Sequence, residues 1–461
     1  MSSLWSSIAA SGAALSGEFR GRGASVAVAD LGVGSTFGSA LESLRGRSVL
    51  VATHEQLPTA LALLELDGVA RRMVLCTPDL TPEQLAGVAA TAQADAIVCD
   101  PQSTKPAPDS LRCVRLEPRP GPERITRRAS EATEWILLTS GTTGTPKLVA
   151  HTLQSLGGAL PTQASSGPQT VWSTFYDIRR YGGLQIYLRA VLAGSPLVLS
   201  SAGEPMLEFL ERAAAAGVTH ISGTPSHWRS ALMSGGAAIL HPRYVRLSGE
   251  VADQAVLDNL RAVYTEARIA HAFASTEAGV AFEVNDGLAG FPRAFLDHPP
   301  GGIELKVVDH TLRIRSSRTA ARYLGAAASA LASEDGYVDT GDMVDLVDGR
   351  FYFRGRIGGV INVGGLKVYP EEIEAVLNAD PRVRMSLVRA RRNPITGAVV
   401  AADVVLANPT STAAADAPDL VKRELLDACR RALAAHKVPA TLRFVPALEF
   451  TAAGKLVRPN G

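Results

Sequence analysis

Short apolar runs alternate with longer amphipathic stretches between residues 48 and 98. Residues 49–52, 73–75 and 96–98 are apolar and partly β-branched, as expected of buried strands. The stretches between them, 58–66 and 81–92, have the length and apolar spacing of helices. This order of strand, helix and strand predicts a parallel sheet covered by helices.

The same alternation returns in the middle of the chain and gives way to short β-rich segments from residue 302 onward, which indicate a small barrel or ribbon. Three glycines within residues 353–359 allow the backbone to absorb large changes in dihedral angle, so a domain boundary is expected there. The elements expected are strands at 196–199, 220–222, 268–270, 303–308 and 311–315, helices at 206–216 and 255–264, and further helices at 370–377 and 420–435 beyond the boundary.

Charge and cysteine content limit the classes of partner. The 461 residues include 46 basic and 45 acidic side chains, a net charge of +1, which gives no overall field that would attract nucleic acid or an anionic membrane. No apolar run reaches the roughly 18 residues of a membrane span, and the N-terminus lacks the pattern of a secretory signal. The four cysteines have no metal-ligand spacing, so buried free thiols are expected. We therefore expect a cytoplasmic protein without nucleic-acid or membrane partners.

A loop rich in glycine and hydroxyl groups lies between two apolar runs, at 135–138 and 148–150, that predict strands. Glycine lets backbone amides approach an anion, hydroxyls add donors, and the final lysine adds positive charge, a combination that suits a triphosphate. The residues concerned are Thr139, Ser140, Gly141, Thr142, Thr143, Gly144 and Lys147.

A kinase or P-loop ATPase is one class that such a loop allows, and it would release ADP. Its signature places a serine or threonine directly after the lysine to bind magnesium. Leu148 follows Lys147 in this chain, which argues against that class.

The loop resembles the phosphate-binding signature of the adenylate-forming superfamily, which includes acyl-CoA synthetases, peptide-synthetase adenylation domains and luciferases. Four further matches follow in the family's order: Ser275-Thr276-Glu277, residues 336–342, the stretch from Gly355-Arg356 to residues 370–374, and residues 451–455. The resemblance implies an α/β fold, in which a large N-terminal domain (1–355) of two α/β-layered subdomains and a small β-barrel-like subdomain precedes a small mobile α+β domain (356–461). Relative to most members, the N-terminal part is short.

The family reaction begins when a carboxylate attacks the α-phosphorus of ATP and pyrophosphate leaves. By resemblance, Glu277 binds Mg²⁺, and Thr276 contacts the α-phosphate. Asp342 and Arg356 bind the ribose, while Lys455 bridges the α-phosphate and the substrate carboxylate. A non-catalytic nucleotide-binding protein would lack Glu277 or Lys455, and both are present.

The resemblance also implies positions for adenine and for a thiol acceptor. Phe273 corresponds to the aromatic residue that stacks on adenine, and Ser248, Gly249 and Glu250 resemble the segment that lies against it. Gly365 belongs to a glycine pair near the tunnel through which coenzyme A would enter. The hinge position, commonly Asp or Lys in relatives, is Gly358, which predicts a looser hinge.

The segment that precedes the expected acyl pocket is unusually polar and lacks an evident gate histidine. Its arginines would either face the pocket, where they suit a second carboxylate, a phenolic oxygen or nitrite, or face solvent and pair with Asp177. Aromatic Trp228 and Phe273 favour a small aryl or arylacrylic acid. The pocket residues expected are Trp172, Tyr176, Asp177, Arg179, Arg180, Gly182 and His227.

The leading hypothesis is an ATP- and Mg²⁺-dependent ligase that joins a small carboxylate to coenzyme A. Two alternatives stay open within the superfamily: loading of an acyl carrier protein, and activation of another anion such as nitrite for diazotisation of an arylamine. The sequence is compatible with a monomer or a homodimer.

Overall fold

The computed structural model describes residues 3–11, 16–103, 108, 110–122, 127–139, 146–160, 170–325, 330–394, 396–407, 418–451 and 454–458. Its first sheet contains the parallel strands predicted from residue 48 onward, with the order β18-β8-β7-β4-β3-β5-β6. Strand β8 returns antiparallel to β7, so the glycine-rich loop joins two strands, as predicted. The strands are β3 (Ser48–Val51), β4 (Arg72–Leu75), β5 (Ala96–Cys99), β6 (Arg112–Arg115), β7 (Glu134–Thr139), β8 (Lys147–His151) and β18 (Arg322–Tyr323).

Helices of the first sheet form where the local sequence favours them. Helix α3 (Gln56–Leu66) has no exposed position, which explains why it is apolar on all sides. Helix α4 (Pro82–Ala92) begins with a capping box in which Thr81 accepts the backbone amide of Gln84, the start that the sequence predicted. One cysteine expectation was wrong: Cys113 is exposed on β6, with its Sγ 3.1 Å from that of Cys99.

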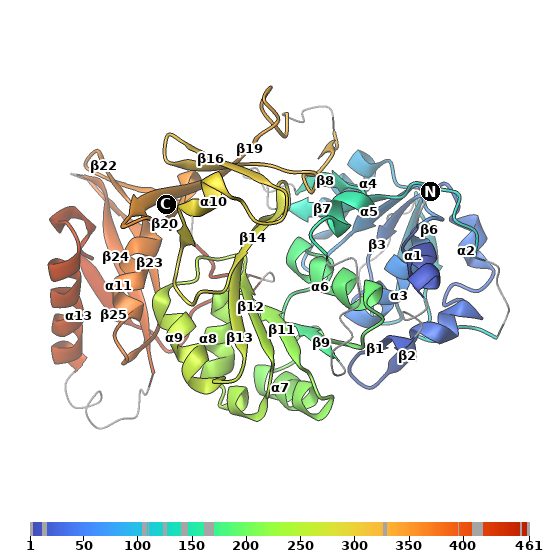
Figure 1. Ribbon diagram of the computed structural model, residues 1–461, viewed down its shortest axis with the longest axis horizontal. Helices are drawn as coiled ribbons and strands as arrows, with labels where there is room; N and C mark the ends of the chain where they lie inside the picture. The colour runs from blue at the N-terminus through green and yellow to red at the C-terminus, as the bar shows by residue number, and fades with distance from the viewer. Residues whose placement is uncertain are drawn as a thin grey trace.

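The second sheet has eight strands in the order β14-β13-β12-β11-β9-β10-β1-β2. The chain before residue 48 adds β1 and β2 to its edge, which the sequence patterns did not indicate. Helices α7, α8 and α9 cover one face, and α6 lies at the junction of the two large sheets (Figure 1). The elements are β1 (Glu18–Arg20), β2 (Ser25–Ala27), β9 (Trp172–Thr174), β10 (Leu197–Leu199), β11 (His220–Gly223), β12 (Tyr244–Ser248), β13 (Arg268–Ser275), β14 (Gly279–Val284), α6 (Tyr181–Leu192), α7 (Met206–Ala215), α8 (Pro225–Met233) and α9 (Gln254–Val263).

A five-stranded antiparallel sheet stands where the sequence indicated a barrel or ribbon, with the order β15-β20-β19-β17-β16. Its core contains a group of phenylalanine rings, including Phe291 and Phe351 at 5.2 Å between centroids. The strands are β15 (Phe291–Pro292), β16 (Glu304–Val308), β17 (Thr311–Arg315), β19 (Val338–Val347) and β20 (Arg350–Arg356).

The C-terminal part has its own hydrophobic core, built entirely from residues after position 360. It forms the red and orange end of the molecule in Figure 1. Its elements are β21 (Ile361–Val363), β22 (Leu366–Val368), α11 (Pro370–Asn378), β23 (Val383–Asn393), β24 (Gly397–Leu406), α13 (Pro418–Ala432) and β25 (Thr441–Phe444). The fold is therefore α/β with a large N-terminal part and a smaller C-terminal one, as predicted.

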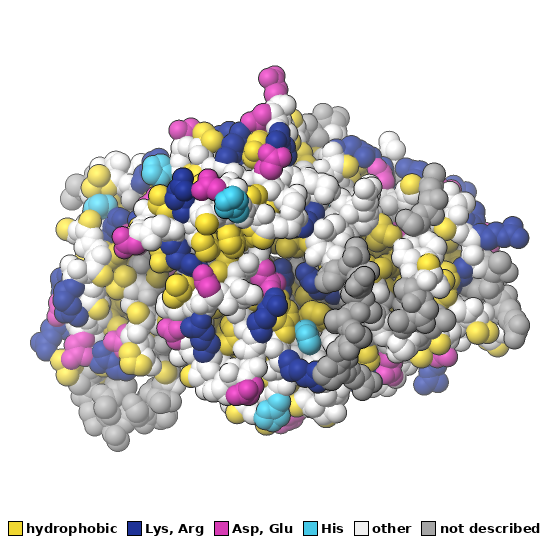
Figure 2. Space-filling view, in the orientation of Figure 1, with side chains coloured by type: hydrophobic (Ala, Val, Ile, Leu, Met, Phe, Trp, Pro, Cys, Tyr) yellow, Lys and Arg dark blue, Asp and Glu magenta, His cyan; other side chains and the backbone are white. Residues whose placement is uncertain are grey.

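The distribution of charged side chains on the surface agrees with the near-neutral net charge. Basic and acidic side chains are interspersed over the described residues visible in Figure 2, without a large area of one sign. Among the helices that the structure describes, none is long and apolar enough to cross a membrane.

Candidate active site

The candidate site lies where the C-terminal ends of β11 and β12 meet the β13–β14 turn, the third sheet and the C-terminal part. Ligands of open α/β sheets bind at this end of the strands, because the connecting loops converge there. A cavity of about 500 Å³ opens beside it, lined by Ser275, Glu277, Tyr323, Thr340 and Arg356 among others.

The two ends of the glycine-rich loop are paired across the β7–β8 hairpin, since Thr139 and Lys147 are register partners. Residues 140–145 lie outside the described part, so the structure does not place the predicted Ser140, Gly141, Thr142, Thr143 and Gly144. The ammonium of Lys147 lies 5.5 Å from the ring centroid of Tyr323.

Tyr323 links that lysine to the predicted metal-binding carboxylate. Its hydroxyl donates to Oε1 of Glu277 at 3.3 Å, and burial, followed by the Glu277 charge, raises the pKa of Tyr323 to about 12. The tyrosine therefore remains a neutral donor at physiological pH. No sequence motif indicated Tyr323, because β18 is only two residues long and lies far from Glu277 along the chain.

The turn that carries Thr276 and Glu277 is held by a buried histidine at the end of β8. His151 Nε2 lies 2.7 Å from the backbone oxygen of Thr276, and its Nδ1 lies 3.0 Å from the hydroxyl of Ser155. Burial lowers the pKa of His151 to about 4, so the ring is neutral and must carry its proton on Nε2 to bond a carbonyl. No sequence pattern indicated this role.

Asp342 and Arg356, the two residues predicted to bind the ribose, are register partners on β19 and β20. Arg356 Nε lies 3.4 Å from Asp342 Oδ1, and Arg356 also donates to the backbone oxygen of Thr340 at 2.9 Å. Burial raises the pKa of Asp342, while the charges of Arg356 and Lys455 act in the opposite direction. The carboxylate thus faces both predicted cationic groups.

A turn near the C-terminus brings Lys455 to the end of β12. Thr224 Oγ1 donates to the backbone oxygen of Gly454 at 2.8 Å, and the amide of Leu456 donates to Glu250 Oε1 at 3.2 Å. The lysine side chain passes over Gly249, where an added Cβ would lie 3.5 Å from Cε and 3.9 Å from Nζ. Lys455 as a residue is exposed, yet loss of solvation from surrounding protein lowers the pKa of its ammonium, and Glu250 opposes that effect.

The ring of His227 packs against the backbone of Gly454 in this turn. It is the third residue of α8, where Thr224 forms the capping box, and its ring stacks on Phe175 at 5.5 Å between centroids. Burial lowers the pKa of His227 to about 4, so the ring is neutral. Tyr176 lies edge-on to the same ring and donates to the backbone oxygen of Ser248 at 2.6 Å. The structure therefore brings Tyr176, His227, Ser248 and Lys455 together.

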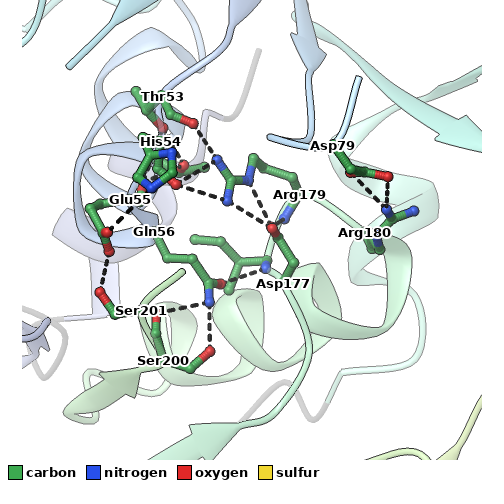
Figure 3. A network of polar contacts seen from close by, with 12 residues as sticks. Thr53, His54, Glu55, Gln56, Asp79, Asp177, Arg179, Arg180, Ser200 and Ser201 are labelled. Carbon is green, nitrogen blue, oxygen red and sulfur yellow. Dashed lines mark hydrogen bonds and ion pairs between the residues drawn. The ribbon is translucent and has the colours of Figure 1, made fainter. Parts of the chain in front are cut away.

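The arginines that precede α6 point in opposite directions, as Figure 3 shows. Arg179 is buried, donates twice to Asp177 at 2.7 and 2.8 Å, and donates to the backbone oxygen of Thr53. Burial alone would raise the pKa of Asp177, but the guanidinium outweighs it and holds that pKa low. Arg179 thus pairs with Asp177 rather than facing the pocket, whereas Arg180 pairs with Asp79 at 3.0 Å.

Four other predicted residues lie in different parts of the structure. Gly182 packs on the ring of Tyr176, but Trp172 contacts His220 and Tyr244 at the N-terminal ends of the strands, away from Lys455. Phe273 stacks on Phe353 at 4.9 Å in the core of the third sheet. Gly365 occupies the exposed turn between β21 and β22, where an added Cβ would meet open space.

Glu277 and Arg356 line one cavity, Arg356 pairs with Asp342, and Lys147 at the end of the glycine-rich loop contacts Tyr323 of the same cavity. This arrangement agrees with a nucleotide-binding enzyme. The chain belongs to the AMP-binding enzyme family, because the model of that family matches residues 49–318, more than half of the chain. The description of the AMP-binding enzyme C-terminal domain matches residues 372–455.

Curated relatives include two 2-succinylbenzoate–CoA ligases. That of Salmonella typhimurium is 30% identical over 266 residues, covering 54% of this chain and 53% of the relative, so the match spans about half of that enzyme. That of Escherichia coli K12 is 28% identical, covering 74% of this chain and 73% of the relative. Among solved structures, the anthranilate CoA ligase AuaEII in complex with anthranoyl-AMP has a similar fold, with a TM-score of 0.81, 18% identity, and coverage of 99% and 95%.

Proposed function

We propose that the chain is an AMP-forming ligase that adenylates a small aromatic or arylacrylic acid with ATP and transfers the acyl group to coenzyme A. The observation that carries the proposal is the position of Lys455, which the C-terminal part places over Gly249 and within the electrostatic reach of Asp342 and Arg356. Relatives named as CoA ligases support the choice of acceptor.

Each charged group has a place in the proposed adenylation. Asp342 accepts the ribose hydroxyls through its two oxygens, with Arg356 as the neighbouring donor. The Lys455 ammonium lies between the attacking carboxylate and the α-phosphate, where it offsets charge that grows as the new P–O bond forms. The protein around the ammonium weakens its hydration, which strengthens its attraction to these anions.

Glu277 fits a Mg²⁺ site that nucleotide phosphates would complete. Its carboxylate has the Tyr323 hydroxyl as its one hydrogen-bond donor among the described residues, so oxygen lone pairs remain available. The described residues contain no group of three or more metal ligands. In the proposed site, the phosphate oxygens of ATP supply most of the ligands of the ion, and Glu277 supplies one. When bound, Mg²⁺ would neutralise charge on the phosphate oxygens.

The test measures ATP–pyrophosphate exchange against a panel of aryl, arylacrylic and aliphatic acids and nitrite, and then product formation with coenzyme A or a carrier protein. We expect AMP and a thioester of an aryl acid. Lys455→Ala should reduce exchange by at least about 100-fold, whereas Lys422→Ala on α13 should leave it unchanged. Release of ADP, or near-normal exchange by Lys455→Ala, would overturn the assignment.

A further inference from the structure

The face of the second sheet that meets α6 carries an unusual group of charges. On β12, Tyr244, Arg246 and Ser248 point to the same side because side chains alternate along a strand. On α6, Tyr181, Gln185 and Arg189 follow one another at intervals of four residues and lie on one helix face. Helix α6 contacts the same sheet, since the hydroxyl of Tyr181 accepts the amide of Val280 on β14, two strands away from β12.

Arg246 is almost fully buried and incompletely paired. Its side chain is 2% exposed, and its Nε makes no hydrogen bond with a described residue and has only a long ion pair with Glu283 Oε2. It lies 3.4 Å from Glu283, which it reaches across the small alanines of β13, but that carboxylate already accepts from Tyr244 at 2.6 Å and binds Arg268. One carboxylate therefore serves two arginines.

Arg189 adds a second guanidinium with no ion pair at all among the described residues. Its Nε is buried without a hydrogen-bond partner. Burial, and next the charge of Arg246, lower the pKa of Arg189, while the charges of Tyr244 and Glu283 act in the opposite direction. Beside them, the buried Oε1 of Gln185 also has no partner, although its amide nitrogen donates to Leu156.

Buried cations that repel each other are costly unless an anion or a set of hydrogen bonds compensates them. Arg189 and Arg246 have buried Nε groups that make no hydrogen bond among the described residues, and the Glu283 carboxylate beside Arg246 also pairs with Arg268, so positive charge exceeds negative charge here. A carboxylate oxygen placed between Arg189 and Arg246 would accept from both and would remove the repulsion.

The position of this pair relative to Lys455 fits one extended ligand. Arg246 precedes Ser248 by two residues on the same face of β12, so it lies about 7 Å further from the lysine end of the strand. Ser248 accepts from Tyr176, and the next residue, Gly249, lies under the Lys455 side chain. A rigid aryl spacer bridges a distance of that order.

We propose that Arg189 and Arg246 bind a second carboxylate of the acid whose first carboxylate is adenylated beside Lys455, so that the preferred substrate class is an aromatic dicarboxylic acid. This inference rests on the proposed function. It assigns the selection of substrate to residues outside the motifs of the sequence, and it leaves Arg179 with its structural pairing to Asp177.

The experiment compares matched acids in ATP–pyrophosphate exchange with the full chain: benzoate and cinnamate against their carboxyl-substituted counterparts and the methyl esters of these. We expect the free diacids to exceed the monoacids and esters by roughly 100-fold in kcat/KM. Arg189→Met and Arg246→Gln should lower that ratio at least tenfold while the exchange supported by the monoacids persists. Arg293→Gln, an exposed arginine paired with Asp297, serves as the control and should leave the ratio unchanged.

A stability measurement separates substrate binding from a merely structural role. Since Arg189 makes no ion pair with any residue that the structure describes and its Nε makes no hydrogen bond, Arg189→Met should leave the unfolding temperature of the ligand-free protein unchanged or higher. A fall in that temperature, or an unchanged diacid preference in Arg189→Met and Arg246→Gln, would overturn the inference. If no acid supports exchange, both the proposed function and the dicarboxylate site are wrong. If monoacids and diacids support exchange equally well, only the dicarboxylate site is wrong.

Discussion

Gly454 decides how closely the lysine turn can approach α8. Its φ of +66° lies in the left-handed region, and a Cβ built there would overlap the ring of His227. Both features require glycine at this position. The sequence resemblance pointed to the lysine that follows, but the structure shows that its neighbour sets the depth to which that lysine reaches.

Gly454→Ala should therefore keep the lysine away from the site. We expect adenylation, measured by ATP–pyrophosphate exchange, to fall by at least about tenfold, because the turn must rise off His227 while Lys455 itself is unchanged.

Gly397→Ala is the matched control for that substitution. Gly397 has a φ of +75°, but a Cβ there meets nothing within 4 Å. It should cost about 1 kcal/mol of stability from backbone strain and leave exchange unchanged. Equal activity of the two variants would contradict the steric explanation.

At the scale of helices and strands, the sequence predicts features that depend on local residues, but not those that depend on how strands meet in the folded sheet. Most strands and helices of the first sheet followed from apolar spacing, and the cap at Thr81 followed from its local sequence, whereas α6, α8 and the edge strands β1 and β2 were not predicted. Thr224-Pro225 has the same kind of capping sequence, so the start of α8 could have been predicted from it. The hydrogen bond from Thr224 to Gly454 could not. Tyr323 and His151 had no signal, because their roles depend on strands that meet only in the folded sheet. The position of Trp172 at the start of β9 could not be predicted, because a run of residues does not reveal which end of a strand faces the ligand.

The bond from β8 to the β13–β14 turn predicts a dependence of stability on pH. His151 has a pKa of about 4 in the folded protein against an ordinary 6.5, so its stabilising contribution is complete above pH 6.5 and is lost as the pH falls toward 4. This shift corresponds to about 3 kcal/mol. His151→Gln should show a smaller loss of stability than the native protein between pH 7 and pH 5, measured as the urea midpoint.

Other buried groups titrate in the same range, so the comparison must be between the two proteins at each pH. His227 shares the depressed pKa of about 4, while burial raises the pKa of Asp67 to about 6 and makes its contribution fall as the pH rises. Both groups are common to the native protein and the variant and cancel in the difference. Parallel pH curves would show that His151 does not titrate with unfolding.

On the scale of the whole molecule, few polar contacts between described residues hold the C-terminal part against the second sheet and its helices. Besides the bonds of Gly454 and Leu456, Asn378 donates to Asp253 at 3.3 Å and Arg384 donates to the backbone oxygen of Met233 at 3.5 Å. Interfaces of this kind permit movement between domains. The chain connecting the parts passes through Ile357–Gly359, a short helical turn in which a Cβ at Gly358 or Gly359 would meet open space. We propose this turn as the hinge of a rotation between adenylation and thioester formation.

Gly358→Pro tests the hinge because proline restricts the backbone without a steric clash of its Cβ. If the C-terminal part must rotate to admit coenzyme A, the variant should keep pyrophosphate exchange within about twofold and slow thioester formation at least about tenfold. Gly359→Ala, which retains most of the backbone freedom, should affect neither step. Since the contacts at Gly454 and Leu456 hold Lys455 in place for the first step, restricting the hinge leaves that step intact, and an equal loss of both steps would place the defect in folding instead.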